Sequence, residues 1–223
     1  MVKIDPYKQK ERYEKWKGKG AKITEVSKKN ADIIRKFVFD MEKGLNISHL
    51  HKKGSRSYIR LNSYISKLKT LSILIKKSTK KDLIDINKEE LHDFFSDMRN
   101  GKIKRRDGKL YVQPNEYVTA FKSFWHWRQR ANKRKIEDIT IDLDTSKSKP
   151  PWCYLNEKEF KKLAENCKSN YKIIAYFLLD VGLRPTEFIN IRASDFNEND
   201  KGEMFLNVKD EISKIIGRKI KLM

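Results

Sequence analysis

An arginine stands directly after an apolar stretch of the chain, at a point where a buried segment would normally end. In "LLDVGLRPTEFINIRASDF", residues 178–196, the apolar run reaches Gly182, and Arg184 and Glu187 follow. A guanidinium fixed at a helix start offers two parallel N–H donors, which suit the oxygens of a phosphate. The alternative is a surface arginine in a turn, paired with Glu187. The spacing of these residues leaves both interpretations open.

The chain of 223 residues is strongly basic, with 51 Lys and Arg against 30 Asp and Glu and a formal net charge of +21. Such an excess favours a polyanionic partner, and nucleic acid ahead of a membrane surface. No run of about 18 apolar residues is present, and the N-terminus lacks the apolar core of a secretory signal. We therefore expect a cytoplasmic, nucleoid-associated protein, and the abundance of Lys, Asn and Ile hints at a prokaryotic or viral source.

Two cysteines, Cys153 and Cys167, are too few for a disulfide framework, and no set of Cys and His residues has the spacing of a zinc site. We expect two reduced intracellular thiols and no bound metal.

The charge is concentrated in the first two thirds of the chain. Residues 1–150 hold 38 basic and 19 acidic side chains, whereas residues 151–223 hold 13 and 11. The two regions meet at "TSKSKPP", where paired prolines forbid a helix. We therefore predict a basic mobile arm over 1–23, a helical domain over 24–140, a linker over 141–152 and a second domain over 153–223.

Local signals predict four helices in the first domain. One begins after Ser27 and ends near Gly44, and apolar residues at helical spacing mark a second over 58–77. Asn87, followed three residues later by a glutamate, predicts the capping box of a third helix. Pro114 stands at a permitted first position of the fourth, which ends in a cationic turn. A hairpin around residues 107–108 is a further possibility.

The region after the linker has a different pattern. "LNEKEFKKLAENC" and "YKIIAYFLLDVG" predict two helices, and "TEFINIRASDF" predicts a short third. "EMFLNVKDEISKIIGRKIKLM" predicts two strands joined by a turn. The predicted fold class is therefore mainly α, with a four-helix domain followed by an α+β region that contains a small β-hairpin.

These motifs resemble the tyrosine recombinases, the phage-integrase and Xer-type family. The proline linker, "YLNEKEF" and "DVGLRPTEFINIRASDF", including Asp195, are similar in order and spacing to the start of the family's catalytic domain. "AFKSFWHW" is similar to the last helix of the family's core-binding domain. The resemblance implies a SAM-like core-binding domain, a site-specific DNA recombinase (integrase) activity through a 3′-phosphotyrosine, and no metal or nucleotide cofactor.

The resemblance also implies roles for individual residues. Arg184 corresponds to the first catalytic arginine, and Glu187 to a supporting acidic position. The family carries a lysine on a β-hairpin that protonates the departing 5′-oxygen, and Lys209 fits this position best. Lys214 is the competitor if the turn is shorter, and a plain hairpin charge is the alternative for either lysine.

The family's second catalytic box and its nucleophile have no counterpart after Arg184. The four histidines all precede this arginine, as does the last tyrosine, Tyr176. We therefore interpret 153–223 as an incomplete catalytic domain and expect these residues to bind double-stranded DNA without cleaving it. Further recombinase protomers on the same DNA are possible partners, and a membrane is not. A non-catalytic module that occupies recombination sites, or a basic RNA-binding protein, remains an alternative.

Three basic clusters in the first domain are candidates for phosphate contact. Their members are Lys67, Lys69, Lys102, Lys104, Arg105, Arg106, Arg128, Arg130, Lys133, Arg134 and Lys135. Aromatic residues crowd 121–127, and their spacing favours a core over base stacking. We expect only Trp127 among them to be partly exposed.

Overall fold

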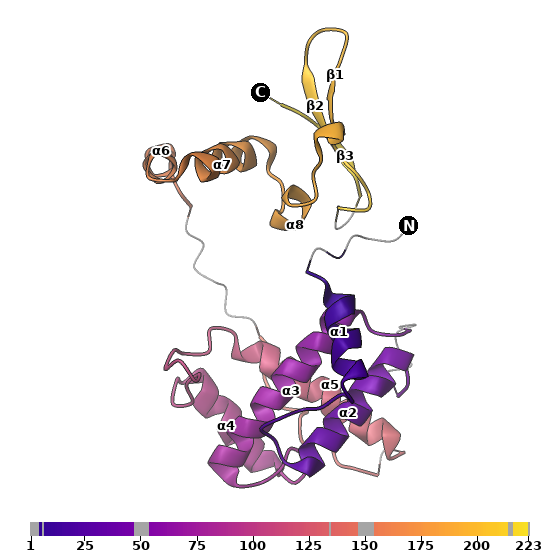
Figure 1. Ribbon diagram of the computed structural model, residues 1–223. Helices are drawn as coiled ribbons and strands as arrows, with labels where there is room; N and C mark the ends of the chain where they lie inside the picture. The colour runs from indigo at the N-terminus through magenta and orange to yellow at the C-terminus, as the bar shows by residue number, and fades with distance from the viewer. Residues whose placement is uncertain are drawn as a thin grey trace. The chain divides into compact units, whose positions relative to one another are not determined.

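The structure is a computed structural model that describes residue 5 and residues 7–46, 54–133, 135–146, 154–213 and 216–222. The chain divides into two compact units, the first over Gln9–Lys149 and the second containing Pro150–Met223 (Figure 1). Within the described ranges the fold is mainly helical, with eight α-helices, one short 3₁₀ helix and a sheet of three strands. The mainly α prediction is thus confirmed at this level.

The first unit is built from α2 (Lys28–Lys43), α3 (Tyr58–Thr79), α4 (Lys88–Arg99) and α5 (Pro114–Ala131), with an additional helix before them. The predicted end signals of these helices are confirmed. Ser27 accepts a hydrogen bond from the Asn30 N–H at 3.1 Å, and Gly44 ends α2 in the left-handed conformation at φ 76°. Asn87 and Glu90 form a reciprocal capping box at the start of α4.

The additional helix, α1 (Gln9–Gly18), lies in the stretch predicted to be a mobile arm. That prediction is wrong for these residues. The Tyr13 side chain is fully buried, its ring centroid lies 5.5 Å from that of Tyr58, and its hydroxyl donates to Glu42 at 3.0 Å. Burial raises the pKa of Tyr13 well above its usual range. The first unit therefore has five helices in its described part, and α1 is packed on its core.

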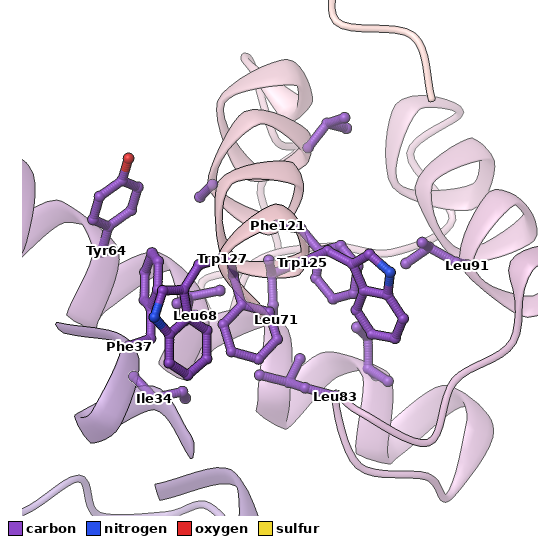
Figure 2. Close-up of a cluster of buried hydrophobic side chains, with 14 of the residues drawn as sticks. Ile34, Phe37, Tyr64, Leu68, Leu71, Leu83, Leu91, Phe121, Trp125 and Trp127 are labelled. Atoms are coloured by element: carbon purple, nitrogen blue, oxygen red, sulfur yellow. The ribbon is translucent and has the colours of Figure 1, made fainter. Parts of the chain in front are cut away.

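Aromatic residues of α2 and α5 form the centre of this core (Figure 2). Phe37 meets Phe124 edge to face with centroids 5.6 Å apart, and Phe121 stacks on Trp125 at 5.8 Å. The prediction that Trp127 is partly exposed is wrong. Its side chain is buried, and its Nε1 donates to Asp40 at 2.8 Å. These rings are thus core residues and are not available to stack on bases.

Two further boundaries differ from the sequence-based expectations. The predicted linker over 141–152 starts too early, because Leu143 is buried in the first unit's core. Around residues 107–108 the chain forms a turn, in which the Arg105 N–H donates to the Lys109 carbonyl at 2.9 Å. The described residues of this loop contain no strand.

The second unit combines helices with a small sheet (Figure 1). Its helices are α6 (Glu157–Glu165), α7 (Ser169–Val181) and α8 (Pro185–Phe188), followed by a 3₁₀ turn at Ala193–Asp195. The strands β1 (Phe196–Glu198), β2 (Met204–Val208) and β3 (Arg218–Lys221) form an antiparallel sheet in the order β1-β2-β3. The predicted hairpin corresponds to β2 and β3. The short helix predicted over 186–196 forms only as α8 and the 3₁₀ turn, and β1, which follows it, was not predicted.

Candidate nucleic-acid interface

Arg184 is positioned by the end of α7. Gly182 ends this helix in the left-handed conformation at φ 58°, which an L side chain adopts only at a cost. Leu183 then anchors the chain in the small core of the second unit. Arg184 becomes the residue before α8, and its backbone N–H donates to Glu187 Oε2 at 3.0 Å. The turn thereby directs both the backbone and the side chain of Arg184 toward one carboxylate.

That carboxylate is the centre of a three-residue cluster of Arg184, Glu187 and Arg218, which we call the Glu187 cluster. The Glu187 side chain is fully buried. Arg184 Nη1 donates to Oε1 at 3.0 Å, while Arg218 donates to Oε1 at 3.2 Å and to Oε2 at 3.0 Å. The hydrogen bond from Arg218 is the main reason that the pKa of Glu187 falls to about 2. Glu187 is therefore ionised at neutral pH.

The cluster carries more positive than negative charge. Its two guanidinium groups share one carboxylate, and their side chains are 46% exposed for Arg184 and 36% for Arg218. Each guanidinium has five N–H donors, of which Arg184 uses one and Arg218 two on Glu187. The pairing of Arg184 with Glu187 is thus present, as the turn interpretation expected. This pairing still leaves N–H donors that do not bind Glu187, on partly exposed side chains, and an excess positive charge; binding of a phosphate requires both.

Arg218 was not among the residues predicted for this site. It comes from β3, where it lies opposite Val208, and it reaches a carboxylate 31 residues earlier in the chain. No local spacing in the sequence links Arg218 to Glu187. The only sequence signal for this part of the site was the predicted second strand of the hairpin, which contains Arg218.

Lys209 follows β2 directly, at the position expected for a hairpin lysine. It forms a separate ion pair, with its Nζ 2.5 Å from Oδ1 of the buried Asp195. This contact is the main cause that lowers the pKa of Asp195, and the Arg192 N–H donates to the other carboxylate oxygen at 2.9 Å. The geometry resembles a structural ion pair that joins the 3₁₀ turn to the sheet. Lys214, the competing lysine, lies outside the described residues.

Most basic residues predicted in α3 and in the loop after α4 are engaged in surface ion pairs. Lys67 pairs with Glu116 at 2.7 Å and Lys102 with Asp97 at 2.8 Å. Glu25 is shared by Lys69 at 2.6 Å and Arg106 at 3.3 Å, while Arg105 pairs with Asp107 at 3.1 Å. Such exposed pairs contribute little to stability, and an anion can displace them.

The basic end of α5 differs, because its arginines bind the protein itself. The Arg128 guanidinium lies 4.5 Å over the Trp125 ring and donates to the Ile84 carbonyl at 3.1 Å. Its burial lowers the pKa of Arg128. Arg130 donates to the Asn46 carbonyl at 3.4 Å. The structure therefore gives Arg128 a packing role, and the phosphate contact that the sequence suggested for it stays a prediction.

The basic residues predicted just after α5 differ in what the structure describes of them. Lys133 and Lys135 are exposed, and Arg134 lies outside the described residues. Of the two cysteines, Cys167 is a free thiol, and Cys153 also lies outside the described part of the chain.

Comparison of the sequence with models of protein families and with curated proteins gave no match. Among the described residues, no three or more His, Cys, Asp or Glu side chains are grouped so that they could hold a metal ion. In the same part of the chain, every helix is too short or too polar to cross a bilayer.

Proposed function

We propose that this chain binds duplex DNA, and that its second unit is part of a site-specific recombinase of the tyrosine class in which Arg184 binds a backbone phosphate. The formal net charge of +21 and the motif from Gly182 to Asp195 support this proposal. The observation that carries it is the Glu187 cluster, where two partly exposed guanidinium groups share one buried carboxylate and keep N–H donors that do not bind it.

The cluster fits the chemistry of phosphodiester binding. In-line attack on a phosphodiester concentrates negative charge on the non-bridging oxygens, and fixed guanidinium donors stabilise such charge. Glu187 holds both guanidinium groups in place before a phosphate arrives, so that binding loses little side-chain entropy. We assign Arg184 the phosphate contact and Glu187 the positioning of Arg184. Arg218 supplies the additional positive charge that the shared carboxylate leaves unneutralised.

Residues 1–223 hold no histidine and no tyrosine after Arg184, so we expect them to bind DNA without breaking it. Fluorescence anisotropy with a labelled duplex, competed by unlabelled duplex or by structured RNA at equal salt, tests the binding. Preference for RNA over duplex DNA would contradict the proposal. Nicking of a suicide substrate by residues 1–223 that disappears in Arg184→Ala would show that the expectation of inactivity is wrong.

A second candidate is a DNA-binding module that acts by occupying sites and has no catalytic role. The ion pair between Lys209 and the buried Asp195 favours it, because this lysine serves the local fold. In this case, loss of Lys and Arg residues in the first unit should weaken binding far more than Arg184→Ala does. Comparison of the two kinds of variant on one duplex separates the candidates.

A further inference from the structure

A groove of about 1070 Å³ crosses the surface of the first unit. One wall is α3, and the opposite wall is formed by residues 104–106, the segment 111–113 and the start of α5. Five cations line it, namely Lys69, Lys77, Lys104, Arg105 and Arg106, together with the carboxylates of Glu25 and Glu116. The groove is therefore cationic by composition.

The two carboxylates do not neutralise it. Glu25 is held by Lys69 and Arg106, which keep the pKa of this carboxyl below its usual range. Glu116 is paired with Lys67, which is not among the residues that line the groove. In the described part of the chain, the ammonium groups of Lys77 and Lys104 form no ion pair, and both side chains are exposed. Positive charge thus remains on both walls of the groove.

Apolar and aromatic residues also line the groove. Ile73 and Leu74 of α3 face the groove, as do Tyr111 and Tyr117, whose ring centroids lie 5.2 Å apart in an edge-to-face contact. Val112 also lines it and is 78% exposed, which is unusual for a residue of this type. A ligand that fits this lining must present both anionic groups and less polar groups.

A sugar–phosphate backbone has this pattern. Lys69 and Lys77 are eight residues apart on α3, a separation of about 12 Å along the helix axis. The same length of duplex holds about three to four nucleotides of one strand. Phosphates can therefore reach successive cations of the groove, while sugars contact Val112 and the tyrosine edges.

We propose that this groove is where the first unit binds the backbone of duplex DNA, in preference to the basic end of α5. The inference rests on the proposed function, since it assumes that the chain binds duplex DNA. At the end of α5, by contrast, Arg128 stacks on Trp125, and both Arg128 and Arg130 donate to backbone carbonyls. Lys77 and Lys104 make the primary phosphate contacts, and Val112 makes the apolar one.

The test compares two double variants of the full chain that lose the same charge. Lys77→Gln/Lys104→Gln removes the two unpaired cations of the groove, and Lys36→Gln/Lys43→Gln removes two exposed cations of α2. Because two phosphate contacts are lost, we expect the groove variant to bind a labelled duplex about tenfold more weakly than wild type. The plot of its log K against log salt should be less steep, with a slope smaller in magnitude by about 1.8. The α2 variant should stay close to wild type in both, and circular dichroism verifies that all variants are folded.

A third variant, Val112→Ser, isolates the apolar contact. It should weaken duplex binding a few-fold and leave the salt slope unchanged, because no phosphate contact is lost. Equal losses in the groove and α2 variants would overturn the inference and leave general DNA binding intact. Competition by poly-glutamate as strong as that by duplex DNA would also overturn it, in favour of an acidic polypeptide. Absence of duplex binding by wild type would instead reject the proposed function itself.

Discussion

Replacement of Glu187 by glutamine should destabilise the second unit, because both guanidinium groups of the cluster lose their carboxylate. In the folded protein the pKa of Glu187 is lowered from 4.5 to about 2, which corresponds to about 3 kcal/mol of stabilisation at neutral pH. Arg184 and Arg218 are partly exposed, so water replaces some of the lost interaction in the variant. We therefore expect Glu187→Gln to lower the free energy of unfolding by about 2 kcal/mol.

The direction of the pKa shift also fixes how this stabilisation depends on pH. The pKa of Glu187 is lower in the folded state than in the unfolded chain. Its contribution is therefore complete above about pH 4.5 and is lost as the pH falls toward 2. The difference in stability between wild type and Glu187→Gln should be largest near neutral pH and should shrink over this acidic range.

Native-state hydrogen exchange, followed by mass spectrometry on peptides that cover β2 and β3, measures this difference. A loss of about 2 kcal/mol corresponds to exchange about thirtyfold faster at neutral pH. Glu157→Gln is the matched control, because this carboxylate lies on the surface of α6 and pairs only with Lys161 in the described structure. We expect exchange in the control to equal that of wild type. Unchanged exchange in Glu187→Gln would refute the claim that this carboxylate ties β3 to α8.

Three further perturbations test the fold. Gly217→Ala should speed hydrogen exchange in β2 and β3, because a Cβ at this position would lie 2.5 Å from the Val208 carbonyl oxygen; unchanged exchange would contradict this packing. Trp127→Ala should lower the urea-unfolding free energy of the first unit by about 3–5 kcal/mol, whereas a loss below about 1 kcal/mol would mean that the ring is not in the core. Limited proteolysis should cleave the second unit before residues 25–135, because exposed apolar side chains such as Ile173 and Leu179 leave it a smaller core. Equal resistance of the two units would show this comparison to be wrong.

The helix ends of the first unit could be predicted because their signals are local. Ser27, Asn87 and Pro114 each act within one turn of the chain, so residue type and spacing suffice to place them. The helix α1 could not be predicted in this way. Its sequence is almost entirely polar, and Tyr13 stabilises it through contacts with residues more than 25 positions away. Tertiary contacts, which periodicity does not register, decide the structure there.

The same distinction explains the candidate site. Arg184 and Glu187 are three residues apart, so their pairing was foreseeable, and the alternative interpretation named it. The contribution of Arg218 depends on the register of β3 against β2, which brings a distant residue onto Glu187. The stacking of Arg128 on Trp125 could not be predicted for a related reason, since a basic run does not reveal which of its members packs on a neighbouring ring.

The salt dependence of duplex binding by Arg184→Ala tests the central claim most directly. In this variant the residue-184 N–H and Arg218 can still hold Glu187, so the site should keep its structure. If Arg184 contacts a backbone phosphate, the variant's slope of log K against log salt should be smaller in magnitude than that of wild type by about 0.9. The charge-matched variant Lys161→Ala, on α6, should keep the wild-type slope. A slope in Arg184→Ala equal to that of wild type would contradict the phosphate contact and, with it, the assignment of this unit to a recombinase.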